Sequence, residues 1–312
     1  MALKQVLDTY HILDDIHVNG QVVVDYAKKA GIADAGYEHV VTDGHWTDFV
    51  RFVIPGTEGK TKGGKAPTLG LIGQLGGIGA RPERIGFVSD GDGALAVVSA
   101  AIKLAEMSQR GDALPGDVII TTHICPVAPT MPHDPVPFMG SPVKMSTNVK
   151  HTVDSAMDAI LSVDTTKGNR IVNHKGFAIS PTVKEGYILR VSEDLLRIMQ
   201  QTTGDLPVTI PITTQDITPY GNGLYHMNSI LQPSCGTKAP TVGVAITTKS
   251  AVPGCGTGAT HEVDVAETVQ YLIEVAKEYT SGTCVFYDAE EFERIQALYG
   301  SMTQLQSMGH QK

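Results

Sequence analysis

The sequence predicts an α/β fold: a three-layer α/β/α sandwich with a mainly parallel, mixed sheet. Short apolar runs alternate along the chain with segments of helical periodicity, the pattern that gives parallel strands covered on both faces. Apolar residues make up 42% of the 312 residues, enough for a full core. Because no internal repeat and no long linker divides the chain, we expect a single α/β domain over residues 1–312.

The first 30 residues are expected to form two N-terminal helices, over residues 3–16 and 20–30. In the first of these, apolar residues recur at a spacing near 3.6. Residues 49–54 and 68–72 are apolar runs of strand length, which we predict to be buried strands.

The middle part contains the longest predicted helix, over residues 93–109, which is apolar on nearly every side and should pack tightly against a sheet. Apolar strands are predicted after it, over residues 117–126, 157–163, 207–212 and 241–247.

Two further helices carry end signals. For the helix over residues 192–202, Ser192 is placed to cap the start and Gly204 to stop the end. The last helix is predicted to begin at Asp264, where Asp264 and Glu267 have the spacing of a capping box.

Composition excludes several classes of partner. A net charge of −9 argues against a nucleic-acid groove and against an anionic membrane surface. No apolar run approaches the roughly 18 residues of a spanning helix, and the N-terminus lacks a signal-peptide pattern. The four cysteines show no C-x-x-C spacing, which argues against a zinc ribbon or a disulfide framework. We therefore expect a cytoplasmic protein without nucleic-acid or membrane partners.

The acidic glycine turn Ser89-Asp-Gly-Asp-Gly93 follows an apolar strand-like end and opens the long helix. Strand ends that open into helices are where α/β proteins place ligands. Asp90 and Asp92 are therefore candidate site residues, with N-capping of the helix as the alternative role.

The order of several motifs resembles the co-catalytic di-zinc aminopeptidases and related carboxypeptidase-like hydrolases, over about residues 40–279. The motifs are Asp43-Gly-His-Trp46, Thr68–Gly76, Ser89–Gly93, Thr121-Thr-His-Ile124, Asp164-Thr-Thr166 and Asp264-Val-Ala-Glu-Thr268. The chain also resembles the family catalogued as domain-of-unknown-function 1177. The resemblance implies a zinc-peptidase-like topology. A lid domain, which some of these peptidases carry, is not expected, because only residues 78–89 fill its place.

Most metal ligands of the resembling hydrolases are replaced in this chain. The replacements are Gln74 and Gly76 for a His and an Asp, Ser89 for the bridging Asp, and His123 and Ile124 for the Glu pair. Only Asp164 matches, and a co-catalytic pair needs several N and O ligands per ion. We therefore expect no metal or one divalent metal ion, with Asp90, His123 and Asp164 as its candidate ligands.

The loop from His123 to Pro135 contains four prolines and should be stiff. It presents His123, Cys125, His133 and Asp134 beyond a strand end. Cysteine near histidine and an acid is the pattern of a covalent hydrolase, so Cys125 is a candidate nucleophile. A single-metal site and a loop whose histidines make ordinary hydrogen bonds are the alternatives.

Together these features predict a hydrolase-like protein that acts on a small amide, peptide or amino-acid derivative through a rebuilt site. Its partner would be a small-molecule or short-peptide substrate, and a homo-oligomer is possible. The alternative is a non-catalytic binding or partner protein. The candidate catalytic residues are His123, Asp164, Asp90 and Cys125, and the candidate substrate-binding residues are Gln74, Ser89, His133, Asp134 and His226.

Overall fold

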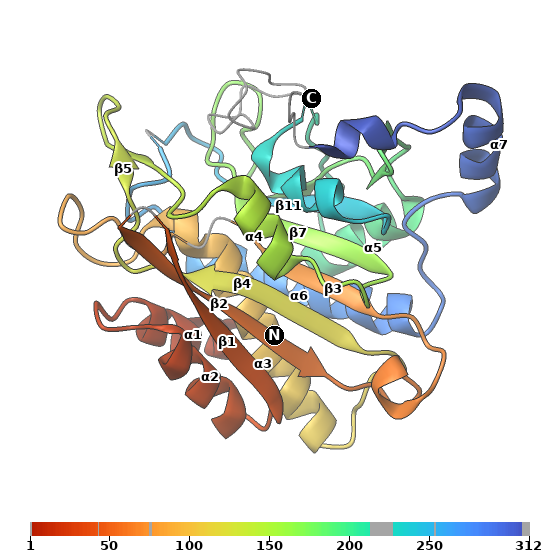
Figure 1. Ribbon diagram of the computed structural model, residues 1–312, viewed down its shortest axis with the longest axis horizontal. Helices are drawn as coiled ribbons and strands as arrows, with labels where there is room; N and C mark the ends of the chain where they lie inside the picture. The colour runs from red at the N-terminus through yellow and green to blue at the C-terminus, as the bar shows by residue number, and fades with distance from the viewer. Residues whose placement is uncertain (1, 43, 75–76, 213–226, 253, 308–312) are drawn as a thin grey trace.

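A mixed sheet lies at the centre of the chain (Figure 1). The computed structural model describes residues 2–42, 44–74, 77–212, 227–252 and 254–307. Within them the strands run in the order β1-β2-β4-β3-β7-β11-β9-β10, with β8 paired to β11. Their bounds are β1 Asp34–Thr42, β2 His45–Ile54, β3 Leu69–Gly73, β4 Val118–Ile124, β7 Ala159–Thr165, β8 Gly176–Ile179, β9 Val183–Lys184, β10 Tyr187–Ile188 and β11 Thr241–Thr247; β5 Thr130–Met131 and β6 Phe138–Met139 form a separate ladder.

The four central strands β4, β3, β7 and β11 are parallel, and antiparallel strands flank them on both sides. This confirms the predicted α/β class with a mainly parallel, mixed sheet. The organisation of residues 1–312 as one domain stays a prediction.

Helices cover the two faces of the sheet unequally. On one face lie α1 Leu3–Leu13, α2 Gly20–Lys29, α3 Asp92–Gln109, α6 Glu262–Thr280 and, packed against α6, α5 Glu193–Thr203. The other face is covered by α4 Met145–Thr152 and the 3₁₀ helix η3 Ser229–Gly236, and α4 lies in front of the sheet in Figure 1. The remaining helices are α7 Ala289–Tyr299, which lies at the periphery, and the short 3₁₀ turns η1 Lys60–Lys62, η2 Ser89–Gly91 and η4 Thr303–Ser307.

Side chains of the central strands alternate between two cores, as the pleat requires. Leu69 and Leu71 of β3 pack toward α3 and α6 in the main core, whereas Ile72 packs toward the α4 side with Ile119 and Ile160. The long helix α3 is buried on nearly all sides, because it lies between the sheet and the helices α1 and α6. Its apolar character, seen in the sequence, is thereby explained.

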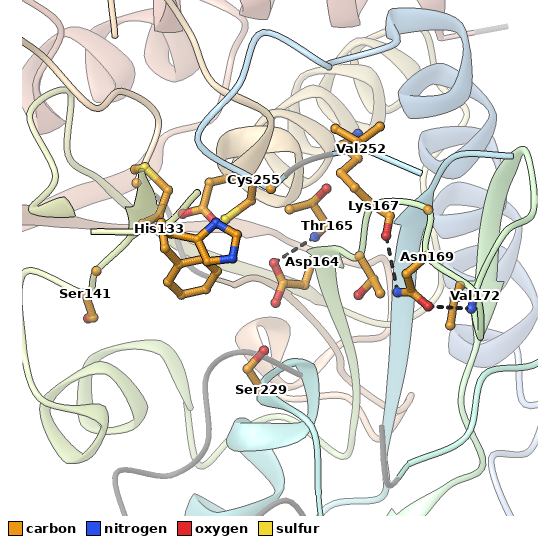
Figure 2. A pocket seen from close by; sticks show the side chains of 18 of the residues that line it. His133, Ser141, Asp164, Thr165, Lys167, Asn169, Val172, Ser229, Val252 and Cys255 are labelled. Carbon is orange, nitrogen blue, oxygen red and sulfur yellow. Dashed lines mark hydrogen bonds between the residues drawn. The ribbon is translucent and has the colours of Figure 1, made fainter. Parts of the chain in front are cut away.

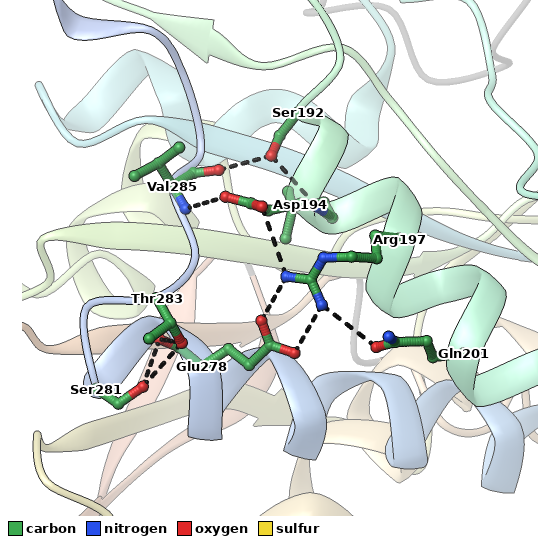
Figure 3. A network of polar contacts seen from close by, with 9 residues as sticks. Ser192, Asp194, Arg197, Gln201, Glu278, Ser281, Thr283 and Val285 are labelled. Carbon is green, nitrogen blue, oxygen red and sulfur yellow. Dashed lines mark hydrogen bonds and ion pairs between the residues drawn. The ribbon is translucent and has the colours of Figure 1, made fainter.

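The helix α5 has the predicted ends: the Leu195 N–H donates to the Ser192 Oγ at 3.2 Å, and Gly204 is left-handed with φ 75°. Figure 3 shows how α5 is joined to α6, where Arg197 donates to both carboxylate oxygens of Glu278 at 3.0 and 2.6 Å. This pair is partly exposed, so it contributes less to stability than the apolar contacts between the two helices.

Two sequence predictions about elements are wrong. The helix α6 begins at Glu262 with His261 as its N-cap, so Asp264 lies inside the first turn and forms no capping box. Residues 207–212 form no strand, and only Thr209 makes a bridge, to Ile179. Of the helices that are described, none is long and apolar enough to cross a membrane.

The carboxylate of Asp117, just before the start of β4, holds the loop at residues 56–61 by hydrogen bonds. It accepts hydrogen bonds from the Gly56 N–H at 2.8 Å, the Thr61 N–H at 2.9 Å and the Thr61 hydroxyl at 2.7 Å. Burial alone would raise the pKa of Asp117, but these hydrogen bonds outweigh it and lower the pKa below its usual value.

We predict that Asp117→Asn lowers the free energy of unfolding by about 2 kcal/mol at pH 7, because charged hydrogen bonds are lost. The folded pKa is depressed, so the stabilisation is present above the unfolded pKa of about 3.9 and is lost as the pH falls through the folded value. Urea denaturation at pH 7 and at pH 3 measures both effects. The difference in the free energy of unfolding between wild type and Asp117→Asn should be smaller at pH 3 than at pH 7. The control Asp112→Asn, at an exposed residue, should have the same free energy of unfolding as wild type at both pH values.

Candidate functional site

A cavity of about 470 Å³ opens at the carboxyl ends of the parallel strands. Its walls come from several parts of the chain: the ends of β4 and β7, the turn before α3, the loops at residues 133–142 and 165–172, and the loop that carries Cys255. Figure 2 shows Asp164, His133 and Cys255 around this space, with Ser229 of η3 on another side. The structure therefore brings together five of the predicted residues: Asp90, His123, His133, Asp134 and Asp164.

Strand register explains why His123 and Asp164 meet. The strand β3 lies between β4 and β7, and Ile72 pairs with Thr121 on one side and Ser162 on the other. Two residues further on, His123, Gln74 and Asp164 fall in one row. The ladder continues this far, because the Gln74 N–H donates to the Val163 carbonyl at 2.8 Å. Alternation then directs all three side chains to the face covered by α4 and η3.

His123 is held as a neutral imidazole. Burial lowers its pKa to about 4. The Thr47 hydroxyl donates to the Ile124 carbonyl at 3.2 Å and lies 2.8 Å from the His123 Nδ1. A hydroxyl has one proton to donate, so Thr47 accepts from Nδ1–H of His123. In a neutral ring, Nε2 is then the basic nitrogen.

Two buried carboxylates line the cavity with His123. The Asp164 Oδ1 accepts from the Thr165 N–H at 2.7 Å, which fixes the carboxylate relative to the strand end (Figure 2). Asp90 is hydrogen-bonded to the Cys255 side chain. Burial raises the pKa of the Cys255 thiol, and the charge of Asp90 and this hydrogen bond raise it further. The thiol therefore stays protonated at neutral pH.

A buried ion pair supports one wall. The Lys167 Nζ donates to the Asp92 Oδ2 at 2.7 Å, and the Thr260 hydroxyl donates to the Asp92 Oδ1 at 2.6 Å. Burial raises the pKa of Asp92, against the lowering effect of Lys167. Asp92 is the first residue of α3 and Gly91 is the N-cap, so the predicted N-capping by Asp90 or Asp92 is not found. The pair instead ties the start of α3 to the loop after β7.

Three predicted residues lie outside the cavity lining. Cys125 is buried, donates to the Trp46 carbonyl at 3.3 Å, and burial raises the pKa of its thiol to about 12. It thus has neither access to the cavity nor a thiolate at neutral pH, and is not placed as a nucleophile. Ser89 donates to the Cys255 carbonyl at 3.1 Å and so holds the Cys255 loop. Gln74 is fully buried, and its amide oxygen and nitrogen have no partner among the described residues.

The remaining predicted residues have these positions. His133 lies at an exposed part of the wall, where its Nδ1 is 3.1 Å from the Val136 carbonyl, and Asp134 follows it. His226 lies outside the described residues, as do Asp43 and Gly76 of the sequence motifs. Sequence reasoning missed Cys255 and Lys167, although the glycines around Cys255 signal a loop able to approach a ligand closely.

The described residues of the cavity do not form a three-ligand metal centre. In the parts of the chain that are described, no group of three His, Cys, Asp or Glu side chains could hold a metal ion. Nδ1 of His123 is engaged with Thr47, and Asp90 with the thiol of Cys255.

A family model described as "Protein of unknown function (DUF1177)" matches residues 38–309. No curated protein sequence matches the chain. Among solved structures, the bottromycin maturation enzyme BotP in complex with Mn is 13% identical over 87% of this chain and 71% of that chain, with a TM-score of 0.48. The LapA aminopeptidase of Legionella pneumophila is 12% identical over 91% of this chain and 72% of that chain (TM-score 0.48). A tomato leucine aminopeptidase mutant is 14% identical over 87% of this chain and 61% of that chain (TM-score 0.46).

Two of these three structures are aminopeptidases by name, the class of hydrolase that the sequence resembles. At these identities and TM-scores, no residue role and no cofactor is transferred from them.

The burial of Cys125 and Cys284 predicts that neither thiol reacts in the folded protein, because the pKa of each is raised to about 12. Iodoacetamide at pH 8, followed by peptide mass spectrometry, should leave both cysteines unmodified while free glutathione reacts fully. In urea both should be alkylated. Rapid alkylation of Cys125 in the folded protein would contradict the position given to it here.

Proposed function

We propose that this chain, which belongs to the DUF1177 family, is a hydrolase-like protein acting on a small amide, peptide or amino-acid derivative. One observation carries the proposal: a neutral imidazole and two buried carboxylates line the same cavity at the ends of parallel strands. Such a combination supplies a base and an anchor for a positively charged group.

His123 is proposed as the general base. Its Nε2 would take a proton from a water molecule as the water attacks the carbonyl carbon of the bound amide. The same nitrogen would then give that proton to the amine nitrogen as the C–N bond breaks, so that a carboxylic acid and an amine leave and His123 is again neutral. A general base must be unprotonated and within hydrogen-bond reach of the attacking water. With a pKa of about 4, His123 is unprotonated throughout the neutral range, and its place on the cavity lining gives it access to bound water.

Asp164 and Asp90 are proposed to hold the amino group of the substrate. An ammonium group is attracted to carboxylates most strongly where water is excluded, and both side chains are nearly fully buried. A cavity of about 470 Å³ has the size of a small-molecule site. His133 and Asp134 would contact the outer part of the substrate.

The net charge and the free cysteines support a proposal about the partners and the cellular compartment of this protein. The net charge of −9 supports the absence of nucleic-acid and anionic-membrane partners. All four cysteines are free, which supports a reducing compartment such as the cytoplasm.

A second candidate function is that of a non-catalytic binding protein, and one set of observations favours it. Cys125 and Cys255 have raised pKa values and are not nucleophilic at neutral pH, and the described residues offer no three-ligand metal group. A cavity that binds a ligand without cleaving it would show the same features.

We predict that purified protein carries at most one divalent metal ion per chain, because the described donors form no group of three. Inductively coupled plasma mass spectrometry on extensively dialysed protein measures the stoichiometry. Two ions per chain would overturn the assignment of donors given above.

We predict that His123→Gln lowers kcat about 100-fold or more, as expected for loss of a general base. Hydrolysis of a panel of aminoacyl p-nitroanilides and dipeptides provides the assay, with His11→Gln, an exposed histidine, as the matched control. Asp164→Asn should mainly raise KM.

The kcat of the wild type should be independent of pH through the neutral range and fall as the pH drops through about 4, because His123 then becomes protonated and no longer acts as a base.

The outcomes separate the two candidates. Turnover that survives His123→Gln would remove the proposed base. Tight ligand binding without turnover by the wild type would favour the binding protein.

A further inference from the structure

We infer that Arg170 is the anchor for a free carboxylate, so that the ligands of the cavity are zwitterions: amino-acid derivatives or short peptides with an unblocked C-terminus. This rests on the proposed function for the identity of the cavity as the ligand site. It adds a specificity-determining residue and a narrower class of ligand.

The charged side chains of the cavity are unevenly placed. The buried acidic groups Asp90 and Asp164 lie at the turn before α3 and at the end of β7, and a third acidic residue, Asp134, lies on an exposed loop of the wall. Both lysine and arginine side chains of the lining, Lys167 and Arg170, come from the loop that follows β7. A ligand with charges of both signs can therefore satisfy two different parts of the wall.

Lys167 is not the anchor for a ligand's negative charge. It is buried, and its ammonium group already pairs with the buried Asp92 at 2.7 Å. A ligand carboxylate at this position would meet the negative charge of Asp92 as well. The role of Lys167 is structural, and the available positive charge is that of Arg170.

Arg170 lines the cavity from an exposed position and forms no ion pair with any described residue. Some other arginines have carboxylate partners: Arg51 pairs with Asp154, Arg190 with Glu291 and Arg197 with Glu278. Arg170 differs from them in this respect, and it differs from the equally exposed Arg84 in lining the cavity. A guanidinium group binds a carboxylate through two parallel hydrogen bonds. The cavity thus presents an arginine that has no carboxylate partner in the described part of the chain and is chemically suited to bind a ligand carboxylate.

The loop that carries Arg170 is held in place before any ligand binds. The Asn169 Oδ1 accepts from the N–H groups of Ile171 at 2.8 Å and Val172 at 2.9 Å, and part of this arrangement is visible in Figure 2. The Gly168 N–H donates to the Thr248 hydroxyl at 2.8 Å. A preorganised loop lowers the entropy cost of binding, so Arg170 can act as a positioned anchor.

Two anchors then define the ligand. Asp164 and Asp90 hold the ammonium end, and Arg170 holds the carboxylate end. The cavity volume of about 470 Å³ limits the length between them to a few residues. A peptide whose C-terminus is amidated keeps its shape but loses the charge that Arg170 recognises.

The test uses a panel of dipeptides that differ in their first residue, each as free acid and as C-terminal amide, with binding measured by isothermal titration calorimetry. Wild type should bind the acids about tenfold or more tightly than the amides. Arg170→Gln should abolish this preference, and Arg170→Lys should restore part of it. Arg84→Gln is the matched control, because Arg84 is also exposed and lies outside the cavity lining.

Equal binding of acids and amides by wild type, a preference that survives Arg170→Gln, or no binding by any dipeptide would each overturn the inference. Hydrolysis of dipeptides without a preference for the acid would leave the proposed function standing and remove only the role of Arg170. Acid-selective binding without hydrolysis would support Arg170 and favour the binding protein.

Discussion

The site depends on one constraint, the parallel pairing of β3 with β4 on one side and β7 on the other. Parallel strands all end at the same edge of a sheet, so residues far apart in sequence become neighbours there. His123 and Asp164 are brought together in this way, one strand apart, with Gln74 between them. A slip of one residue in either pairing would turn one of these side chains into the main core and dismantle the site.

Much of the centre of the fold could be predicted from the sequence, because its signals are local. The strand at residues 241–247, the helix near 93–109 and the ends of α5 at Ser192 and Gly204 are all where the pattern places them. The edges could not be predicted in the same way. The strand β1 is largely exposed, and α7 buries only Phe292, so neither shows strong apolar periodicity. The apolar run at 207–212 was misjudged because Pro207 and Pro211 cannot donate to a ladder.

The residues of the candidate site also divide into those with a local sequence signal and those without one. Asp90, His123 and Asp164 could be chosen from the sequence because each stands at or near a strand end or a helix start. Cys255 and Lys167 could not, because each depends on a partner far away in the chain: Cys255 on Asp90, and Lys167 on Asp92. Cys125 illustrates the reverse case. It lies next to the site in sequence, yet it is buried, is not part of the cavity lining, and donates to the Trp46 carbonyl.

The unequal covering of the sheet has a consequence for access. Five helices pack over one face, whereas among the described helices the opposite face has only α4 and η3. His123 and Asp164 point to this less covered side, and both are buried. The exposed residues of the cavity lining include His133, Asp134, Asn169 and Arg170, all on loops beyond the strand ends. A molecule that reaches the buried pair would therefore meet these loops first, and Ser229, which is itself buried, only afterwards.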